Sequence, residues 1–200
     1  MNDWTLTGTT ALVVVHMQNA ICTSPSPLDF MGHARATAED GIVPRIAGLL
    51  AAFRGKGLPV VYAVAVHPDE PEVPAYGAFW QGLPDLRVNL AGTRDVEVVD
   101  ELAPLDGEPV VRNWPFDILR QTELEAWLRE RGVETVVLVG VATGMAVIIA
   151  AYQFADRLFN LIVPSDCVTD GNRRLHEAIV DGVLPVIGLV TTADDVVAHL

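Results

Sequence analysis

Short runs of β-branched and apolar residues alternate along this sequence with segments of helical periodicity, and this alternation favours the α/β fold class. The runs expected to form strands are 10–16, 58–66, 109–112, 135–140, 160–165 and 187–191. Because they are almost continuously apolar, both faces of each strand should be buried. The sequence therefore predicts a doubly wound, mainly parallel sheet of six strands with helices on both faces.

Helical patterns fill the segments between these strands. Apolar residues recur at helical spacing from Ile42 to Phe53, and the pattern stops at Gly55. Another helix is expected after Thr122, which would form a capping box with Glu125, and should end at Gly132. The remaining helices are expected in 144–158, 173–184 and 193–199.

Length and charge limit the organisation and the partners of the chain. Two hundred residues suit one domain, residues 1–200, which would bury roughly 70% of its unfolded surface. A formal charge of −13 would repel nucleic acid and anionic lipid, so a small-molecule partner is expected, with no nucleic acid and no membrane. Cys22 and Cys167 form no CxxC pair and should be free thiols, which indicates a cytoplasmic location.

The segment 67–108 lies between two predicted strands but contains many prolines and little periodicity. Long irregular loops in small domains are often functional. Phe79 and Trp80 in this segment could cover a binding pocket, or they could attach the loop to the core. The sequence favours neither alternative.

Ligands of open α/β sheets bind beyond the carboxyl ends of the strands, where the strand order reverses. His16 ends the first predicted strand, and Arg112 and Asn113 end the third. The fourth runs through Gly140 into the stretch GVATGMAV, residues 140–147, whose strand–turn–helix pattern is that of a nucleophile elbow. This elbow carries no thiol, amine or acid, so a histidine able to exchange protons is the main candidate for chemistry.

Three motifs resemble the isochorismatase-like hydrolases, a family that includes nicotinamidases and other cysteine amidohydrolases. They are ALVVVHMQN at 11–19, FDILRQTELEAWLRERGVETVVLVGVAT at 116–143 and LIVPSDCVTD at 161–170. The resemblance implies a six-stranded parallel sheet, a catalytic Asp-Lys-Cys set and a cis peptide bond before the motif threonine. The stretches EVPAYGAFWQGL and VTDGNRRLHEAIVDGVLP are similar to a branch of the family that lacks the cysteine.

By position, the resemblance puts His16 where the family has its aspartate and Ala146 where it has its cysteine. The lysine position falls on Asn113, or on Arg112 if the alignment shifts by one residue. The cis bond would join Val141 to Ala142. All three catalytic identities are therefore replaced. A displaced nucleophile at Cys22 is the less favoured alternative to a free thiol near the pocket wall.

Metal-binding relatives carry an aspartate and several histidines after the second strand. Here Ala65 stands at the aspartate position, and His67 is the only histidine between residues 34 and 175. No metal and no cofactor are predicted.

The first hypothesis is a non-thiol enzyme that acts on a small molecule by hydrolysis or other acid–base chemistry. A protonated His16 would be its acid, Arg112 would hold a substrate carboxylate or phosphate, and Asn113 is the other candidate at the lysine position. Backbone N–H groups of residues 144–146 should face the cavity. The predicted walls are Trp80, Trp114, Phe116, Val141, Ala142, Met145 and Ala146.

The alternative is a pseudoenzyme that binds a ligand or a partner protein, which the loss of all three identities favours. Because relatives form dimers or tetramers and the composition is apolar, the resemblance also implies a homo-oligomer.

Overall fold

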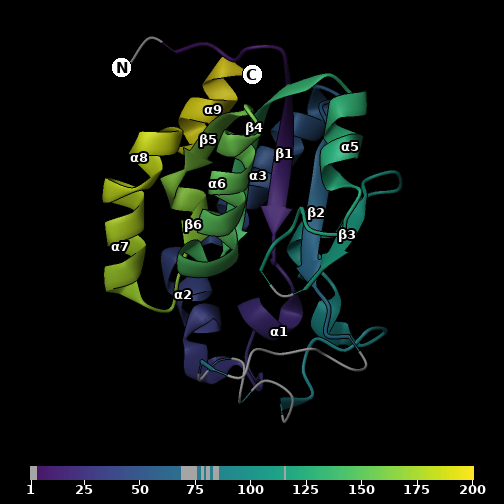
Figure 1. The fold of residues 1–200 in the computed structure, drawn as a ribbon, viewed down its shortest axis with the longest axis vertical. Helices are drawn as coiled ribbons and strands as arrows, with labels where there is room; N and C mark the ends of the chain where they lie inside the picture. Colours follow the sequence, from purple (N-terminus) through teal and green to yellow (C-terminus); the bar gives the residue numbers. More distant parts are fainter. Residues whose placement is uncertain (1–3, 69–75, 78, 80–81, 83–85, 115) are drawn as a thin grey trace.

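A parallel β-sheet forms the centre of the computed structural model, which describes residues 4–68, 76–77, 79, 82, 86–114 and 116–200 (Figure 1). Its strands are β1 (Thr9–Val15), β2 (Val60–Ala65), β3 (Val110–Asn113), β4 (Val133–Val141), β5 (Asn160–Pro164), β6 (Val168–Thr169) and β7 (Leu189–Thr191). The order is β3-β2-β1-β4-β5-β7, with the short β6 paired to the end of β4. The strand order therefore reverses between β1 and β4, as in a doubly wound sheet.

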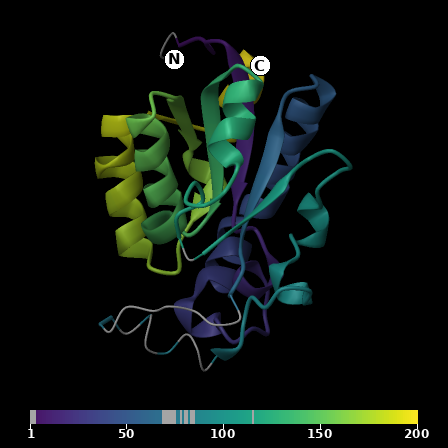
Figure 2. The same cartoon turned by 45° about the vertical axis from the view of Figure 1, so that its right-hand side comes forward.

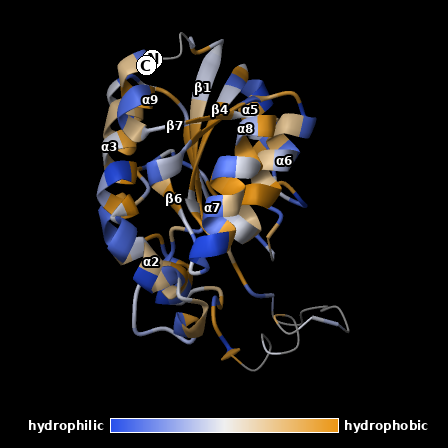
Figure 3. Ribbon diagram, turned by 90° about the vertical axis from the view of Figure 1, so that its left-hand side faces the viewer, coloured by the Kyte–Doolittle hydropathy of each residue, from blue (hydrophilic) through white to orange (hydrophobic). Residues whose placement is uncertain are grey.

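Helices cover both faces of this sheet (Figure 3). The α-helices of the described chain are α1 (Asn19–Cys22), α2 (His33–Asp40), α3 (Ile42–Gly55), α5 (Leu124–Glu130), α6 (Ile148–Asp156), α7 (Arg173–Gly182), α8 (Leu184–Ile187) and α9 (Ala193–His199). Helices α3 and α9 contact each other on one face, and α5, α6 and α8 lie on the other (Figure 2). None of the described helices is long and apolar enough to span a membrane.

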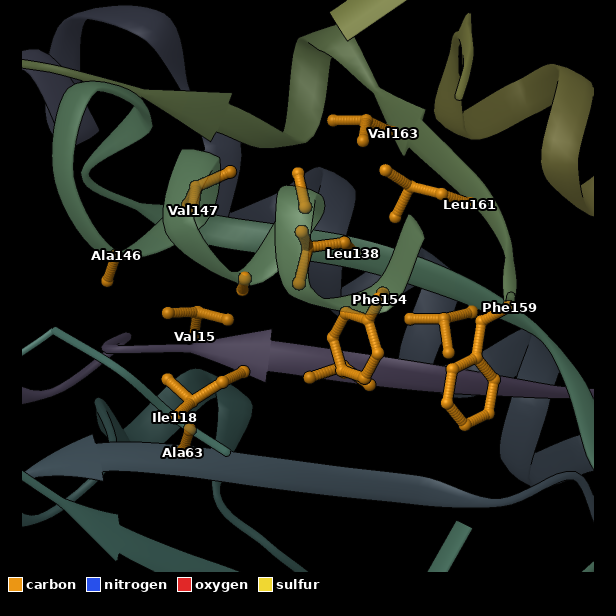
Figure 4. Packing of buried hydrophobic residues seen from close by; sticks show 14 of the residues in the cluster. Val15, Ala63, Ile118, Leu138, Ala146, Val147, Phe154, Phe159, Leu161 and Val163 are labelled. Carbon is orange, nitrogen blue, oxygen red and sulfur yellow. The ribbon is translucent and has the colours of Figure 1, made fainter. Parts of the chain in front are cut away.

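Strand β1 shows why the predicted strands are apolar along their whole length. Val13 and Val15 pack with α5 and α6, whereas Leu12 and Val14 pack with α3 and α9. Successive side chains of a strand point to opposite faces, so a strand covered on both sides is apolar at most positions. Figure 4 shows the first of these clusters, in which Phe154 lies beside Phe159 and Ala146 lies near Val15.

Several local predictions were wrong in detail. The sheet gains the two-residue β6, and helices α1 and α2 form in a region where none was predicted. The capping box of Thr122 and Glu125 does not form. Thr122 Oγ1 donates to Ile118 O at 2.7 Å, and Glu125 pairs with Arg157 Nε at 2.8 Å. A contact across 32 residues thus replaces a local one.

The segment predicted as the long loop 67–108 is partly core. It contains two short 3-10 helices, η2 (Arg94–Val96) and η3 (Asp100–Leu102). Its residues Val99 and Leu102 are buried in the cluster that includes β1 and β2, whereas Val88 is buried in a separate cluster with Ala20 and Leu28.

Gln18 holds both ends of the connection that runs from β2 to Asn89. Its side-chain Oε1 accepts from Ala65 N–H at 2.7 Å, and its Nε2 donates to Ala65 O at 3.0 Å and to Asn89 Oδ1 at 2.9 Å. His67 N–H also donates to Asn89 O at 2.8 Å. Gln18 therefore ties Asn89 to the end of β2.

Candidate active site

His16 lies directly after β1, beside the position where the strand order reverses. Its φ of 51° is in the left-handed region, which is uncommon for a residue other than glycine. His16 N–H donates to Ala63 O at 2.8 Å, which holds this conformation. Strained backbone of this kind is concentrated at functional sites.

The imidazole of His16 is fixed by Asn113, the last residue of β3. The distance from His16 Nε2 to Asn113 Oδ1 is 3.0 Å, and both side chains are buried. Because an amide oxygen only accepts, Nε2 carries the proton, and Nδ1 keeps its lone pair. Within the described residues, Nδ1 has no hydrogen-bond partner.

The structure places Asn113, and not Arg112, beside His16. Asn113 pairs with Ala65 in the sheet register, and the preceding Arg112 points to the opposite side, where it is exposed. The prediction that Arg112 clamps an anion in this site was therefore wrong. Alternate strand residues face opposite sides, so this geometry favours Asn113 over Arg112 as the residue at the lysine position.

Burial lowers the pKa of His16 to about 4, and the hydrogen bond to Asn113 opposes this effect only in part. The surroundings of His16 therefore favour the neutral imidazole at neutral pH. The role of His16 as an acid, which the sequence suggested, stays a prediction, and this shift favours a proton acceptor instead.

The buried neutral histidine should make the protein sensitive to acid. The unfolded chain binds a proton at His16 near pH 6.5, whereas the folded protein binds it only near pH 4. The contribution of His16 to the free energy of unfolding is fully present above pH 6.5 and is lost as the pH falls towards 4. We expect the free energy of unfolding to fall by about 2 kcal/mol between about pH 7 and pH 5 because of His16.

Urea denaturation at the two pH values measures this loss. In the matched variant His16→Gln, the free energy of unfolding should fall by about 2 kcal/mol less between the two pH values than in the wild type. Equal pH dependence in the two proteins would contradict burial of a neutral histidine. Asp40 and Glu108, whose pKa values are lowered, contribute only at more acidic pH.

A cavity of about 50 Å³ opens beside His16. The predicted wall residues that line it are Trp114, Phe116, Val141, Ala142, Met145 and Ala146. The peptide bond between Val141 and Ala142 is cis. The predicted wall residue Trp80 lies outside the described residues.

Six of the fourteen described lining residues were not predicted for the wall: Ile21, Leu28, Met31, His33, Ala65 and Asn89. Phe79, which was considered as a cover, also lines the cavity. These residues come from α1, from α2 with the turn before it, from the end of β2 and from the segment after it. Their sequence positions carry no shared spacing that could have identified them. Among the described lining residues, none carries a formal charge at neutral pH when both histidines are neutral.

The turn after β4 does not direct its backbone N–H groups as the sequence predicted. Residues Thr143–Val147 form one wide helical turn, named η4, before α6 begins. Gly144 N–H donates to Asp170 Oδ2 at 2.7 Å, and Met145 N–H donates to Ala142 O at 3.0 Å. The prediction that these two N–H groups face the cavity was wrong, because both have partners inside the protein.

Neither cysteine is placed to replace the missing nucleophile. Cys22 is buried, its Sγ donates to His16 O at 3.5 Å, and burial raises its pKa to about 12. Cys167 is also buried, and burial raises its pKa. A nucleophilic cysteine needs a lowered pKa and access to substrate, and neither thiol is among the residues that line the cavity.

The sequence pattern of the family described as "Isochorismatase domain" matches residues 10–195. The chain belongs to this family. Its match includes every strand except the first residue of β1, so the sheet is that of an isochorismatase domain. Ala146 therefore lies in the strand–turn–helix stretch 140–147 of an isochorismatase domain.

Two relatives carry the name ureidoacrylate amidohydrolase RutB. The protein of Methylorubrum extorquens is 34% identical over 152 residues, which cover 70% of this chain but only 61% of the relative. The protein of Rhizobium rhizogenes is 30% identical over 200 residues, covering 93% of this chain and 81% of the relative.

A solved isochorismatase family structure is also similar. It comes from Desulfovibrio vulgaris, has 26% sequence identity and a TM-score of 0.83, and aligns with 96% of this chain and all of its own. The parallel sheet with two helical layers is thus that of the isochorismatase domain.

Proposed function

We propose that this chain is an enzyme that acts on an uncharged small molecule without a cysteine nucleophile, with His16 as the proton acceptor. The observation that carries the proposal is the buried, neutral His16 beside the cavity, fixed through Nε2 by Asn113 and with Nδ1 left as an acceptor. A base must be oriented towards the proton that it removes. Asn113 supplies this orientation as a positioning residue.

The reaction class that we propose is hydrolysis of an amide or ureido C–N bond by water. His16 Nδ1 takes a proton from water while the water oxygen forms a bond to the carbonyl carbon. The proton then passes to the nitrogen as the C–N bond breaks, which yields a carboxylic or carbamic acid and an amine or ammonia. The name ureidoacrylate amidohydrolase, borne by the two relatives, supports this class.

The apolar wall defines the substrate further. Trp114, Phe116 and Met145 line the cavity, and its described residues offer no cation to bind a carboxylate. Burial of an unpaired charge costs several kcal/mol, so a neutral substrate should be preferred. The proposed preference for neutral substrates replaces the sequence prediction that Arg112 holds a substrate carboxylate or phosphate.

Turnover of small neutral compounds tests the proposal. Acetamide, benzamide and phenylurea are the probes, and release of ammonia or amine is the readout. We expect hydrolysis of at least one probe, and we expect iodoacetamide treatment to leave the rate unchanged because Cys22 and Cys167 are buried with raised pKa values.

The double variant Cys22→Ala with Cys167→Ala is the matched control for the thiols and should retain the rate. Loss of turnover in this variant, while it remains folded by circular dichroism, would contradict the cysteine-independent mechanism.

A protein that binds a ligand without catalysis is the second candidate. Ala146 at the cavity wall favours it, since a methyl group is all that the elbow presents there. Binding of the probes with no turnover of any of them would support this alternative over the enzyme.

A further inference from the structure

Asp170 is the last residue of the third sequence motif, LIVPSDCVTD, and has no part in the proposed reaction. Its side chain is only 5% exposed. Among the described residues, no lysine or arginine forms an ion pair with it. A buried carboxylate without a cation is unfavourable unless other polar groups satisfy it. The hydrogen-bond partners of Asp170 therefore indicate what this residue does.

Two backbone N–H groups bind this carboxylate. Gly144 N–H donates to Oδ2 at 2.7 Å, and Asn172 N–H donates to Oδ1 at 2.8 Å. These are charge-assisted hydrogen bonds, which are roughly twice as strong as bonds between neutral groups. The bond to Asn172 is local, whereas the bond to Gly144 crosses 26 residues and reaches the turn η4.

The short strand β6 places Asp170 beside this turn. Strand β6 pairs in register with the last two residues of β4, so Asp170 comes next to Ala142. A Cβ atom at Gly144 would lie 3.0 Å from Asp170 Oδ2, which is closer than an ordinary contact. Glycine at position 144 therefore leaves room for the carboxylate.

The loop after β6 also contacts the cavity wall on the side of α2. Gly171 N–H donates to His33 Nδ1 at 3.0 Å. A Cβ atom at Gly171 would lie 1.8 Å from Met31 O, so only glycine allows this close approach. Because Met31 and His33 both line the cavity, the loop lies behind two parts of the wall, one beside α2 and one on η4.

We propose that Asp170 is a positioning residue of the candidate active site, which holds the turn η4 and its wall residues Met145 and Ala146 in place relative to His16. It acts through Gly144 N–H, since Asp170 itself is not among the described residues that line the cavity. The carboxylate thus takes an N–H group that the sequence had assigned to the cavity. The inference rests on the proposed function for its kinetic test, but its structural tests need no turnover.

Carbon-13 NMR of the methionine methyl groups measures the position of the wall. Asp170→Asn keeps one acceptor oxygen, so one of the two N–H groups loses its partner. We expect the Met145 signal, assigned with Met145→Leu, to shift in this variant. The signal of Met17, which is buried and does not line the cavity, should stay in place. An unchanged Met145 signal in Asp170→Asn would overturn the proposal.

Acetate can replace the side chain that Asp170→Gly removes, because it has the same carboxylate and the same adjoining carbon. We expect acetate, but not chloride at equal ionic strength, to raise the Tm of Asp170→Gly and to return the Met145 signal towards its wild-type position. The wild type should not respond in this way. Equal effects of acetate and chloride on Asp170→Gly would contradict the role of the carboxylate, and Asp170→Asn keeps the proposal testable if the glycine variant does not fold.

Asp166→Asn is the matched control. Asp166 belongs to the same motif, and its Oδ1 accepts from Ala193 N–H at 2.9 Å at the start of α9. It is also a carboxylate bound to a backbone N–H group, but it does not belong to the described wall of the cavity. Its substitution should leave the Met145 signal unchanged. An equal shift in both Asn variants would assign the effect to general disturbance and refute the proposal.

Steady-state kinetics with a hydrolysed probe gives a further readout. We expect Asp170→Asn to lower kcat by about 10- to 100-fold with a smaller change in KM, because a displaced wall misorients the substrate relative to His16. Asp166→Asn should keep the wild-type kcat, and a wild-type kcat in Asp170→Asn would rule out the positioning role. Absence of hydrolysis by the wild type, with the NMR shift and the acetate response as expected, would reject the proposed function alone.

Discussion

Replacing His16 by alanine should lower kcat/KM for a hydrolysed probe by about 100- to 10,000-fold, which is the range that a positioned general base contributes. The reason is that Nδ1 of His16 is the proton acceptor that we propose, and the alanine side chain has no group to replace it. The loss should fall on kcat more than on KM, because the base acts in the transition state. Steady-state kinetics of the purified variant measures it.

The control for this prediction is His199→Ala. His199 is a partly exposed histidine at the end of α9, stacked on Trp4 with ring centroids 4.0 Å apart, and it does not line the cavity. Its removal should leave kcat/KM unchanged. If His16→Ala folds and keeps the wild-type rate, His16 is not the base.

Replacing Gly140 by alanine should destabilise the protein by about 4 kcal/mol or more, a size reserved for severe steric or burial defects. A Cβ atom at Gly140 would lie 2.0 Å from Val15 O, and the φ of 122° is one that other residues rarely adopt. Both residues belong to neighbouring strands of the central sheet, so neither can move cheaply. Thermal and urea unfolding measure the effect.

Gly48→Ala is the control, because the same substitution is expected to stabilise the protein at this position. Gly48 lies within α3, is exposed, and has no neighbouring atom within 4 Å of the position that a Cβ atom would take. We expect this change to stabilise the protein by about 0.5–1 kcal/mol, since alanine loses less backbone freedom in a helix. Similar stability of the two variants would show that the close approach of β1 and β4 is not rigid.

The sheet could be predicted because the apolar pattern of each strand is visible within its own short stretch of sequence. Strands β1 and β4 are apolar at all but one of their buried positions each, and the helix α3 repeats its apolar residues at helical spacing. Burial on two faces produces these patterns without reference to any distant residue. The small β6 was not predictable, because two residues carry no periodicity.

The site was predictable only where it follows from strand ends. His16 and the turn at Ala142 meet because β1 and β4 are neighbours and parallel. The choice between Arg112 and Asn113 needed the register of β3, which one sequence does not define.

Two further properties depend on contacts between distant residues. His33 reaches the cavity from the start of α2, and its Nδ1 accepts from Gly171 N–H, 138 residues away. Burial lowers the pKa of His16, and the sequence alone does not show how deeply that side chain is buried.

Gln18 holds together two residues that lie on either side of a long connection. Its amide joins Ala65, at the end of β2, to Asn89. Because these hydrogen bonds come from a side chain beyond β1, they do not use any side chain between Ala65 and Asn89. We therefore expect that a segment grafted from a relative between residues 68 and 87 can change substrate choice while Gln18 keeps Asn89 beside the end of β2.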